Sequence, residues 1–212
     1  TYTIDFDSIN GLKNNNVTYI KDNKIQIEVE VGDALSGYTR ARYDLYTADE
    51  NWICTHKSTN EDNLVPAENN TSRTLTVSGL SDGRYCLNIW VYDDVQNKAL
   101  VDTKGEQWVH FIIDTTPPSI PTGLYFWDVD NNKKVECGGF SNTKHIVGHW
   151  NPTSDINFLK YEYSSFDAPN GNPGLVLYPL TTNYFDSSGW WTIPSEGTYG
   201  FQVRTVDKAS NI

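Results

Sequence analysis

Histidine is the residue type most often recruited for proton transfer and for binding transition metals. Of the four histidines in the sequence, His145 and His149 lie on one face of an expected strand, opposite Ile146 and Trp150. At the rise of a strand the two are about 13 Å apart, too far to hold one metal ion together. We therefore expect both to be surface residues without a metal or catalytic role.

Motifs typical of enzymes are missing from the sequence. It contains no G-x-S-x-G elbow, no His-Glu-x-x-His pair and no glycine-rich phosphate loop. A base, a nucleophile and an oxyanion donor cannot be assembled from the residues present. We expect a protein that is not an enzyme.

Oxygen ligands recur at alternate positions in the segment Asp128, Asp130 and Asn132, which is an arrangement that suits calcium. The segment lacks the glycine and the bidentate glutamate of an EF-hand loop. Calcium is therefore kept as a possible cofactor, beside the simpler interpretation of a solvated turn.

The three cysteines cannot all pair within the chain. Cys54 and Cys86 lie in the same half, each in an apolar strand, and would bridge if the strand of Cys54 lies across from that of Cys86. Neighbouring strands would hold them too far apart, so a disulfide and two free thiols both stay open. Cys137 has no partner in its half, and we expect it to be a free thiol.

Adjacent tryptophans suggest a second kind of binding. On a strand Trp190 and Trp191 must face opposite ways, so one of them would be partly exposed. With Tyr125, Phe126 and Trp127, it could form a platform on which sugar rings stack. Packing in a core or against a neighbouring domain is the alternative.

The amino-acid composition argues against further classes of function. The 212 residues include 27 acidic and 16 basic side chains, a formal charge of −11 that repels phosphate backbones and argues against nucleic acid. No apolar run approaches the roughly 20 residues that span a bilayer, so we expect no membrane insertion. No signal peptide is visible and methionine is absent, so we expect a mature or excised piece of a longer protein.

The hydrophobic pattern is that of strands. Residues 25–31 alternate strictly between apolar and polar, and similar segments occur at 38–46, 51–57, 73–77 and 85–93. No segment shows helical spacing. The sequence predicts an all-β protein.

A proline-rich segment at residues 115–121 lies between two further expected strands, at 107–113 and 123–129. Because prolines hold the backbone extended, we interpret 115–121 as a linker between a domain at 1–114 and a second domain at 122–212.

An internal repeat supports two similar domains. Residues 81–89 (SDGRYCLNI) match residues 195–203 (SEGTYGFQV) without a gap, 114 positions apart. The repeat resembles the E–F corner and strand F of immunoglobulin-like and fibronectin type III domains. The resemblance implies two β-sandwiches in tandem, with Tyr85 and Tyr199 as tyrosine corners and Trp150 as a core tryptophan of strand B.

The second domain ends one residue past the position that matches Asn97, so the resemblance implies that it lacks its last strand. A cut chain is one explanation. Donation of a strand by another copy is the other, because residues 1–5 (TYTID) resemble residues 110–114 (HFIID). The candidate donor strand carries Tyr2, Ile4 and Phe6, although the same segment suits the first strand of its own domain.

The resemblance implies a non-catalytic structural or adhesive module of a bacterial or archaeal cell-surface protein, such as a surface layer, stalk, adhesin or filament subunit. Its partners would be other copies of itself, neighbouring domains of the same protein, or glycans, and its location extracellular. The alternative is a pair of carbohydrate-binding accessory domains from a secreted enzyme. Such motifs specify a fold more strongly than a function.

Overall fold

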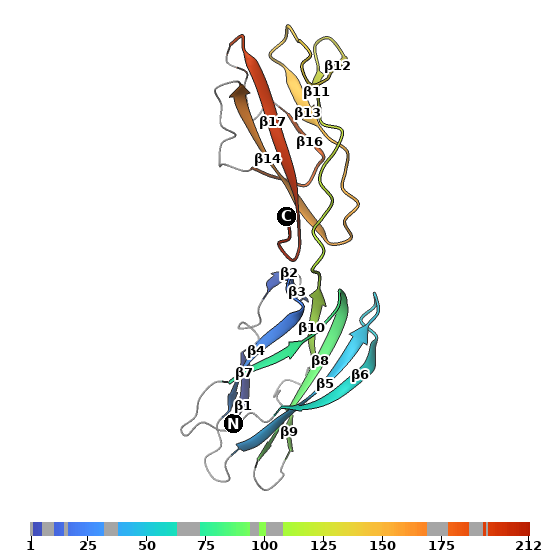
Figure 1. The fold of residues 1–212 in the computed structure, drawn as a ribbon, viewed down its shortest axis with the longest axis vertical. Coiled ribbons are helices and arrows are strands. Elements are labelled where there is room, and N and C mark those ends of the chain that lie inside the picture. Colours follow the sequence, from blue (N-terminus) through green and yellow to red (C-terminus); the bar gives the residue numbers. More distant parts are fainter. Residues whose placement is uncertain are drawn as a thin grey trace. The chain divides into compact units, whose positions relative to one another are not determined.

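The computed structural model describes residues 2–5, 11–14, 17–31, 38–62, 73–93, 98–100, 108–168, 178–186, 193 and 195–212. These residues form strands, turns and extended segments, with no helix among them, so the protein is all-β in its described part. The chain divides into two compact units, Thr1–Thr116 and Pro117–Ile212 (Figure 1). The boundary between the units falls inside the proline-rich segment.

The first unit has two sheets. The smaller sheet has the order β1-β4-β7, formed by β1 (Tyr2–Asp5), β4 (Lys24–Val31) and β7 (Arg73–Ser78), all antiparallel. The larger sheet has the order β2-β3-β10-β8-β5-β6, with β9 beside β8. Its strands are β2 (Leu12–Asn14), β3 (Val17–Ile20), β5 (Tyr38–Ala48), β6 (Cys54–Asp62), β8 (Gly83–Asp93), β9 (Lys98–Leu100) and β10 (Trp108–Ile113).

The pair of β3 and β10 differs from the other strand pairs described. It is parallel, with Phe111 opposite Thr18 and Ile113 opposite Ile20, whereas β10 runs antiparallel to β8 on its other side. Strand β3 therefore pairs with the side of β10 that faces away from β8.

The core of the first unit lies between its two sheets. Alternation in β4 directs Ile25 and Ile27 inward, where they join Leu75 and Val77 of β7. The segment between β7 and β8 supplies Leu80, and the larger sheet supplies the remaining buried residues of the cluster: Ile20, Leu45, Tyr85, Leu87, Ile89, Val109, Phe111 and Ile113. Because a fully buried aliphatic or aromatic side chain contributes about 1.5–3 kcal/mol, this cluster is the main source of the unit's stability.

The second unit also has two sheets. One has the order β12-β11-β13-β16, formed by β12 (Lys133–Val135), β11 (Tyr125–Asp128), β13 (Ile146–His149) and β16 (Tyr184–Asp186). The other has the order β15-β14-β17, formed by β15 (Tyr178–Leu180), β14 (Phe158–Ala168) and β17 (Thr198–Asp207). Long strands β14 and β17 run side by side over almost their whole length (Figure 1).

Aromatic residues make the core of the second unit. Trp150, predicted as a core residue, is 2% exposed and meets Tyr161 edge to face at 5.3 Å between ring centroids. Tyr163 completes the buried set, and Phe126, Phe201 and Val203 pack against it while partly buried. This core is less enclosed than that of the first unit.

The predicted strands are present, most of them with shifted ends. The segment expected at 51–57 is β6, which begins only at Cys54, because residues 49–53 form a turn in which the carboxylate of Asp49 accepts hydrogen bonds from the amides of Asn51 and Ile53. Short strands such as β3, β12 and β16 were not predicted, because three or four residues give too little alternation to detect. In its described part the chain has no helix long and apolar enough to cross a membrane.

Candidate functional site

The repeated tyrosine occupies the same geometry in both units. The Tyr85 hydroxyl donates a hydrogen bond to the carbonyl oxygen of Ser81 at 2.9 Å, and the Tyr199 hydroxyl donates to that of Ser195 at 2.8 Å. In each case the tyrosine ring lies 3.4–3.9 Å from the position that an added Cβ would take on the glycine two residues earlier, Gly83 or Gly197. The repeat therefore forms the same corner in both units, and in each the accepting carbonyl lies four residues before the tyrosine.

The strands that follow these corners have different neighbours. Strand β8 lies between β5 and β10, and both of its backbone edges are paired. Strand β17 pairs with β14 on one side, and in the described part of the chain no strand pairs with its other side. We call this second side the β17 edge, residues 198–207.

Side chains of β8 are more deeply buried than those at the matching positions of β17. Leu87 and Ile89 of β8 are 0% and 2% exposed, whereas Phe201 and Val203 at the corresponding positions of β17 are only partly buried. The β17 edge therefore has a row of backbone groups beside a partly covered apolar core. Such an edge is where proteins add a further strand.

Other edge strands of the second unit are protected. Strand β15 is three residues long and contains Pro179, and β12 is three residues long with Lys133 and Lys134. Strand β17 has ten residues and contains neither proline nor lysine. Because short length, proline and lysine are the usual devices against edge pairing, β17 stands out as the unprotected edge.

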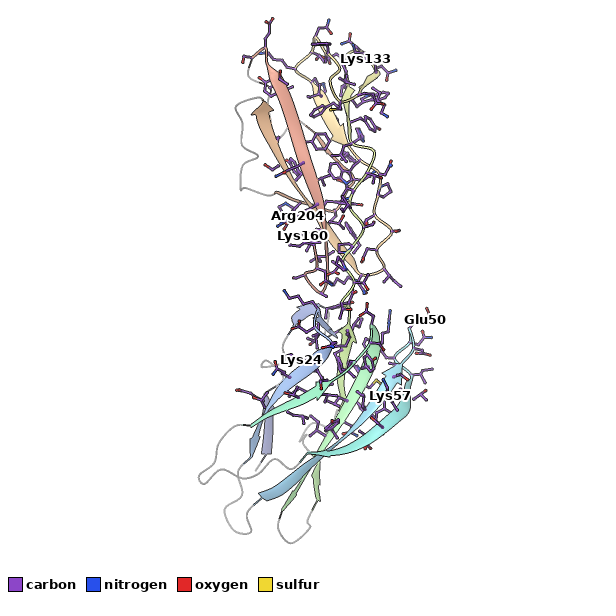
Figure 2. All side chains as sticks on the ribbon, in the orientation of Figure 1. Lys24, Glu50, Lys57, Lys133, Lys160 and Arg204 are labelled. Atoms are coloured by element: carbon purple, nitrogen blue, oxygen red, sulfur yellow. A yellow bond between two sulfur atoms is a disulfide. The ribbon has the colours of Figure 1, made fainter. Side chains whose placement is uncertain are left out.

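The face of β17 that points away from the core carries one ion-pair network. The Glu162 carboxylate on β14 accepts from Arg204 at 2.7 Å and lies 2.7 Å from the Lys160 ammonium (Figure 2). Burial by itself raises the pKa of Glu162, but the hydrogen bonds and charges of Lys160 and Arg204 outweigh it, and the pKa lies below its ordinary value. This network fixes β17 on β14 and leaves the β17 edge unaffected.

Cys54 and Cys86 form a disulfide, with their Cα atoms 6.2 Å apart. The expected arrangement was a bridge between strands lying across from each other, but both cysteines belong to the larger sheet, where β5 separates their strands. Cys54 lies opposite Ala48 on one side of β5 and Cys86 opposite Tyr46 on the other, so the disulfide crosses β5. Cys137 is a free, exposed thiol.

An aromatic cluster surrounds the disulfide on the outer face of the larger sheet. Trp52 stacks on His110 with ring centroids 4.8 Å apart, and the Arg84 guanidinium lies over the Trp52 ring. The ligand atoms of His110, Cys54 and Cys86 lie within 4.8 Å of one another, the one such grouping among the described residues. Because the two sulfurs are bonded to each other, they are not thiolate ligands, and the cluster has a structural role.

Two of the residues proposed for calcium, Asp128 and Asp130, accept hydrogen bonds from neighbouring side chains. The carboxylate of Asp128 is fully buried and accepts hydrogen bonds from the Asn131 amide, the Asn131 side chain and the Ser141 hydroxyl. Asp130 is exposed and accepts from the Thr143 hydroxyl. Donor groups therefore satisfy the oxygens of Asp128 in this turn, an arrangement that favours the solvated turn over a calcium site.

Burial raises the pKa of Asp128, but the hydrogen bonds from Ser141 and Asn131, with the Lys133 charge, lower it further than burial raises it. The net pKa lies below its ordinary value, so the buried carboxylate is ionised at neutral pH. Its role is to hold the turn between β11 and β12.

The histidines of the second unit have no shared site. The Nδ1 atom of His145 lies 3.5 Å from the Oδ1 atom of Asp130, and His149 stacks on Tyr125 with ring centroids 5.2 Å apart. The ring centroids of His149 and Tyr184 are 5.7 Å apart. Partial burial lowers the pKa of His149. Because these rings cover one another's faces, they offer little flat surface to a sugar ring.

Several predicted residues lie outside the described part of the chain. They are Trp190, Trp191 and Phe6. Tyr2 and Ile4 belong to β1, which pairs with β4 of its own unit, Tyr2 opposite Val31 and Ile4 opposite Val29. Tyr125 and Trp127, proposed beside the tryptophans, are partly buried on β11.

The sequence indicated Asp207, at the end of β17, only as a strand-end carboxylate among possible calcium ligands. It is fully buried, and its carboxylate accepts from the backbone amide and the side-chain amide of Asn211. Burial and the nearby Asp207 charge raise the pKa of Asp155, against a lowering by the Asn157 amide. The repeat had placed Asp93 and Asp207 at equivalent positions, and that was the signal available.

No protein-family model matches the chain, and no curated protein matches it. The residues and their arrangement therefore carry the functional argument.

Proposed function

We propose that the chain is a non-catalytic structural module of an extracellular or cell-surface protein, made of two immunoglobulin-like or fibronectin type III-like β-sandwiches in tandem. The observation that carries the proposal is the tyrosine corner, present twice with the same donor and the same acceptor four residues earlier. A corner of this kind is a hallmark of immunoglobulin-like sandwiches.

The strand order of the first unit supports this assignment. In such a sandwich the first, second and fifth strands form one sheet, and the third, sixth and seventh form the other. The orders β1-β4-β7 and β3-β10-β8-β5-β6 fit that scheme, with β10 as the last strand. The second unit fits it with β11-β13-β16 and β15-β14-β17, and β17 takes the place of β8.

The disulfide departs from the antibody pattern but supports an extracellular location. Antibody domains join their two sheets by a disulfide, whereas Cys54 and Cys86 are joined within one sheet. Disulfides persist in oxidising compartments such as the cell surface and are rare in the cytosol. The charge of −11 also suits an exposed, soluble surface.

Immunolabelling of intact source cells tests the location directly. Antibodies against the 212-residue chain are expected to label intact cells, and brief protease treatment of those cells is expected to remove the signal. Labelling that requires permeabilised cells would contradict the proposal. A periplasmic or secreted marker processed in parallel controls for cell integrity.

Carbohydrate binding is the alternative function, with Trp190 or Trp191 as the stacking residue. Among the described residues the observation in its favour is Trp108, which is 40% exposed and meets Tyr46 edge to face at 4.8 Å. A panel of polysaccharides tests it by tryptophan fluorescence of the wild-type chain and of W108A and W190A–W191A variants. A spectral change that these substitutions abolish would favour glycan binding, and no change would exclude it for the sugars in the panel.

A further inference from the structure

We propose that reduction of the Cys54–Cys86 disulfide converts its cluster with His110 into a binding site for one Zn²⁺ ion. The proposal goes beyond a structural module and does not depend on it. In the oxidised chain the two sulfurs are bonded to each other, so neither is a thiolate ligand. In the reduced chain the same three residues offer two thiolates and an imidazole, which are ligands that Zn²⁺ prefers.

The strands bring the three side chains together on the outer face of the larger sheet. His110 of β10 lies directly opposite Cys86 of β8, and the residues on either side of both belong to the core on the other face. Cys54 is the first residue of β6, and its side chain reaches Cys86 across β5. Residues directly opposite on neighbouring strands have Cβ atoms about 4.5–5.5 Å apart, a distance that one bound ion can bridge.

The donor atoms are already near the spacing of a zinc site. A ring nitrogen of His110 and the sulfurs of Cys54 and Cys86 all lie within 4.8 Å of one another. With Zn–S bonds of about 2.3 Å and Zn–N bonds of about 2.0–2.1 Å, the ligand atoms of a tetrahedral site are about 3.5–3.8 Å apart. Once the sulfurs are no longer bonded, rotation about the Cα–Cβ bonds of the cysteines reaches this spacing, while their Cα atoms stay 6.2 Å apart.

The turn before β6 holds the imidazole in place. The carboxylate of Asp49 accepts hydrogen bonds from two amides of this turn, and Trp52 within it has a φ of 62°, a left-handed conformation that non-glycine residues rarely adopt. In this conformation the Trp52 ring stacks on His110, with centroids 4.8 Å apart and planes 22° apart, and the Arg84 guanidinium lies over the Trp52 ring. The His110 ring is therefore positioned before an ion arrives, which lowers the entropic cost of binding.

The three ligands differ in their access to solvent. Cys86 is 0% exposed, whereas Cys54 and His110 are partly buried. A reductant and an ion therefore reach the site from the side of Cys54 and His110. Three protein ligands leave the fourth position of a tetrahedral zinc ion to a water molecule on that side.

Reduction and metal binding are two separate steps. A dithiol supplies two electrons and two protons and becomes a disulfide, while the bond between the sulfurs of Cys54 and Cys86 breaks and two thiols form. Zn²⁺ then displaces both thiol protons, which pass to water, and neutral His110 donates a nitrogen lone pair. In the reverse direction a small-molecule disulfide takes two electrons from the thiolates and two protons from water, so that it becomes two thiols, the protein disulfide forms again and Zn²⁺ is released.

Cobalt titration tests the ligand set. A Cys137→Ser chain, which keeps only the two cysteines of the cluster, is reduced with a dithiol, freed of the reductant under nitrogen and titrated with Co²⁺. We expect one Co²⁺ per chain, with near-ultraviolet absorption from sulfur-to-cobalt charge transfer that disappears when Zn²⁺ is added. The same chain with its disulfide intact should show no such absorption.

A His110→Phe variant separates the ligand from its packing. Phenylalanine keeps a ring beside Trp52 but has no nitrogen, so the Kd for Zn²⁺, measured by competition with a chromogenic chelator, should rise at least about tenfold. His145→Phe makes the same change in the second unit, is the matched control and should leave the Kd unchanged. Equal Kd values for the His110→Phe and parent chains would overturn the proposal.

The folded state is measured in parallel, because reduction removes a stabilising link from the first unit. Zn²⁺ should raise the thermal transition of the first unit in the reduced chain and leave that of a Cys54→Ala, Cys86→Ala chain unchanged. A reduced chain that stays unfolded with Zn²⁺ present, or that binds Zn²⁺ equally tightly in urea, would overturn the proposal. So would the absence of charge-transfer absorption in a folded reduced chain, or one Co²⁺ shared by two chains. The labelling test of the cell-surface proposal is independent of each of these results.

Discussion

Strands β8 and β17 begin with the same corner and have different surroundings. Both start beside a tyrosine that donates to a serine carbonyl four residues earlier. Beyond the corner, β8 has a strand on each side and Leu87 and Ile89 are fully buried. Among the described strands β17 pairs only with β14, and Phe201 and Val203 are partly buried. Local sequence therefore determines the corner, and the neighbouring strand determines how completely the core is covered.

The largest expected difference between the units concerns a matched core pair. Ile89→Ala removes a side chain that is 2% exposed, so we expect the first unit to lose about 2–5 kcal/mol of unfolding free energy. Val203→Ala at the matching position removes a smaller, partly buried side chain, with an expected loss of about 1 kcal/mol. Urea unfolding followed by hydrogen exchange of β8 and β17 amides reports the two units separately. Equal losses would show that the β17 edge is covered in solution.

The disulfide provides the next effect, confined to the first unit. Replacing both Cys54 and Cys86 by alanine reopens a link across a sequence separation of 32 residues. We expect a loss of about 3–4 kcal/mol from the first unit, because its unfolded state gains freedom. Calorimetry of the double variant should show a lower transition temperature for the first unit and an unchanged one for the second. A single-site Cys137→Ser variant is the matched control, since that thiol is exposed and free.

Removing the tyrosine hydroxyl should change the unfolding free energy by a smaller amount, and by different amounts at the two corners. Tyr85 is 3% exposed and its hydrogen bond is partly buried, whereas that of Tyr199 is exposed. Tyr85→Phe should cost about 1–2 kcal/mol, because it leaves a partly buried carbonyl without its donor, and Tyr199→Phe about 0.5 kcal/mol. Thermal unfolding of each variant measures both. A larger effect at Tyr199 would mean that its corner is covered by a partner.

Acid should weaken both units by a similar, small amount. Burial raises the pKa of Asp82, but hydrogen bonds from Thr115 and Thr116 lower it below its ordinary value, as Ser141 and Asn131 do for Asp128. A carboxyl group whose pKa is lowered on folding stabilises the protein above its unfolded pKa, and this contribution is lost as the pH falls below about 4.

Urea unfolding at pH 3, 5 and 7 measures this dependence. Asp128→Asn should flatten the acid response of the second unit alone, and Asp82→Asn that of the first unit alone. An acid response that survives in the double variant would assign it to other carboxyl groups.

Much of the fold could be predicted from sequence where alternation is long. The strict pattern of residues 25–31 became β4, the repeat at 81–89 and 195–203 became the two corners, and Trp150 proved to be buried. The repeat could be found because glycine, tyrosine and alternating apolar residues are all needed to build the corner.

Other features depend on contacts between distant residues. The parallel pairing of β3 with β10 joins residues about ninety positions apart, and no local pattern encodes it. Residues 51–53, predicted as the start of a strand, belong instead to the turn in which Asp49 accepts hydrogen bonds from the amides of Asn51 and Ile53. The carboxylate of Asp128 was considered as a possible calcium ligand beside a solvated turn, because its donor Ser141 lies thirteen residues away and no local pattern indicates that hydrogen bond.

The parallel contact of β3 and β10 also has a mechanical consequence for the first unit. Because β3 lies near the beginning of the unit and β10 at its end, tension along the polypeptide pulls two parallel neighbours in opposite directions. The hydrogen bonds between residues 18–20 and 111–113 are then loaded in shear and must break together, instead of opening one after another as in a zipper. A short strand pair thus makes the unit resistant to force along the chain, whatever its equilibrium stability.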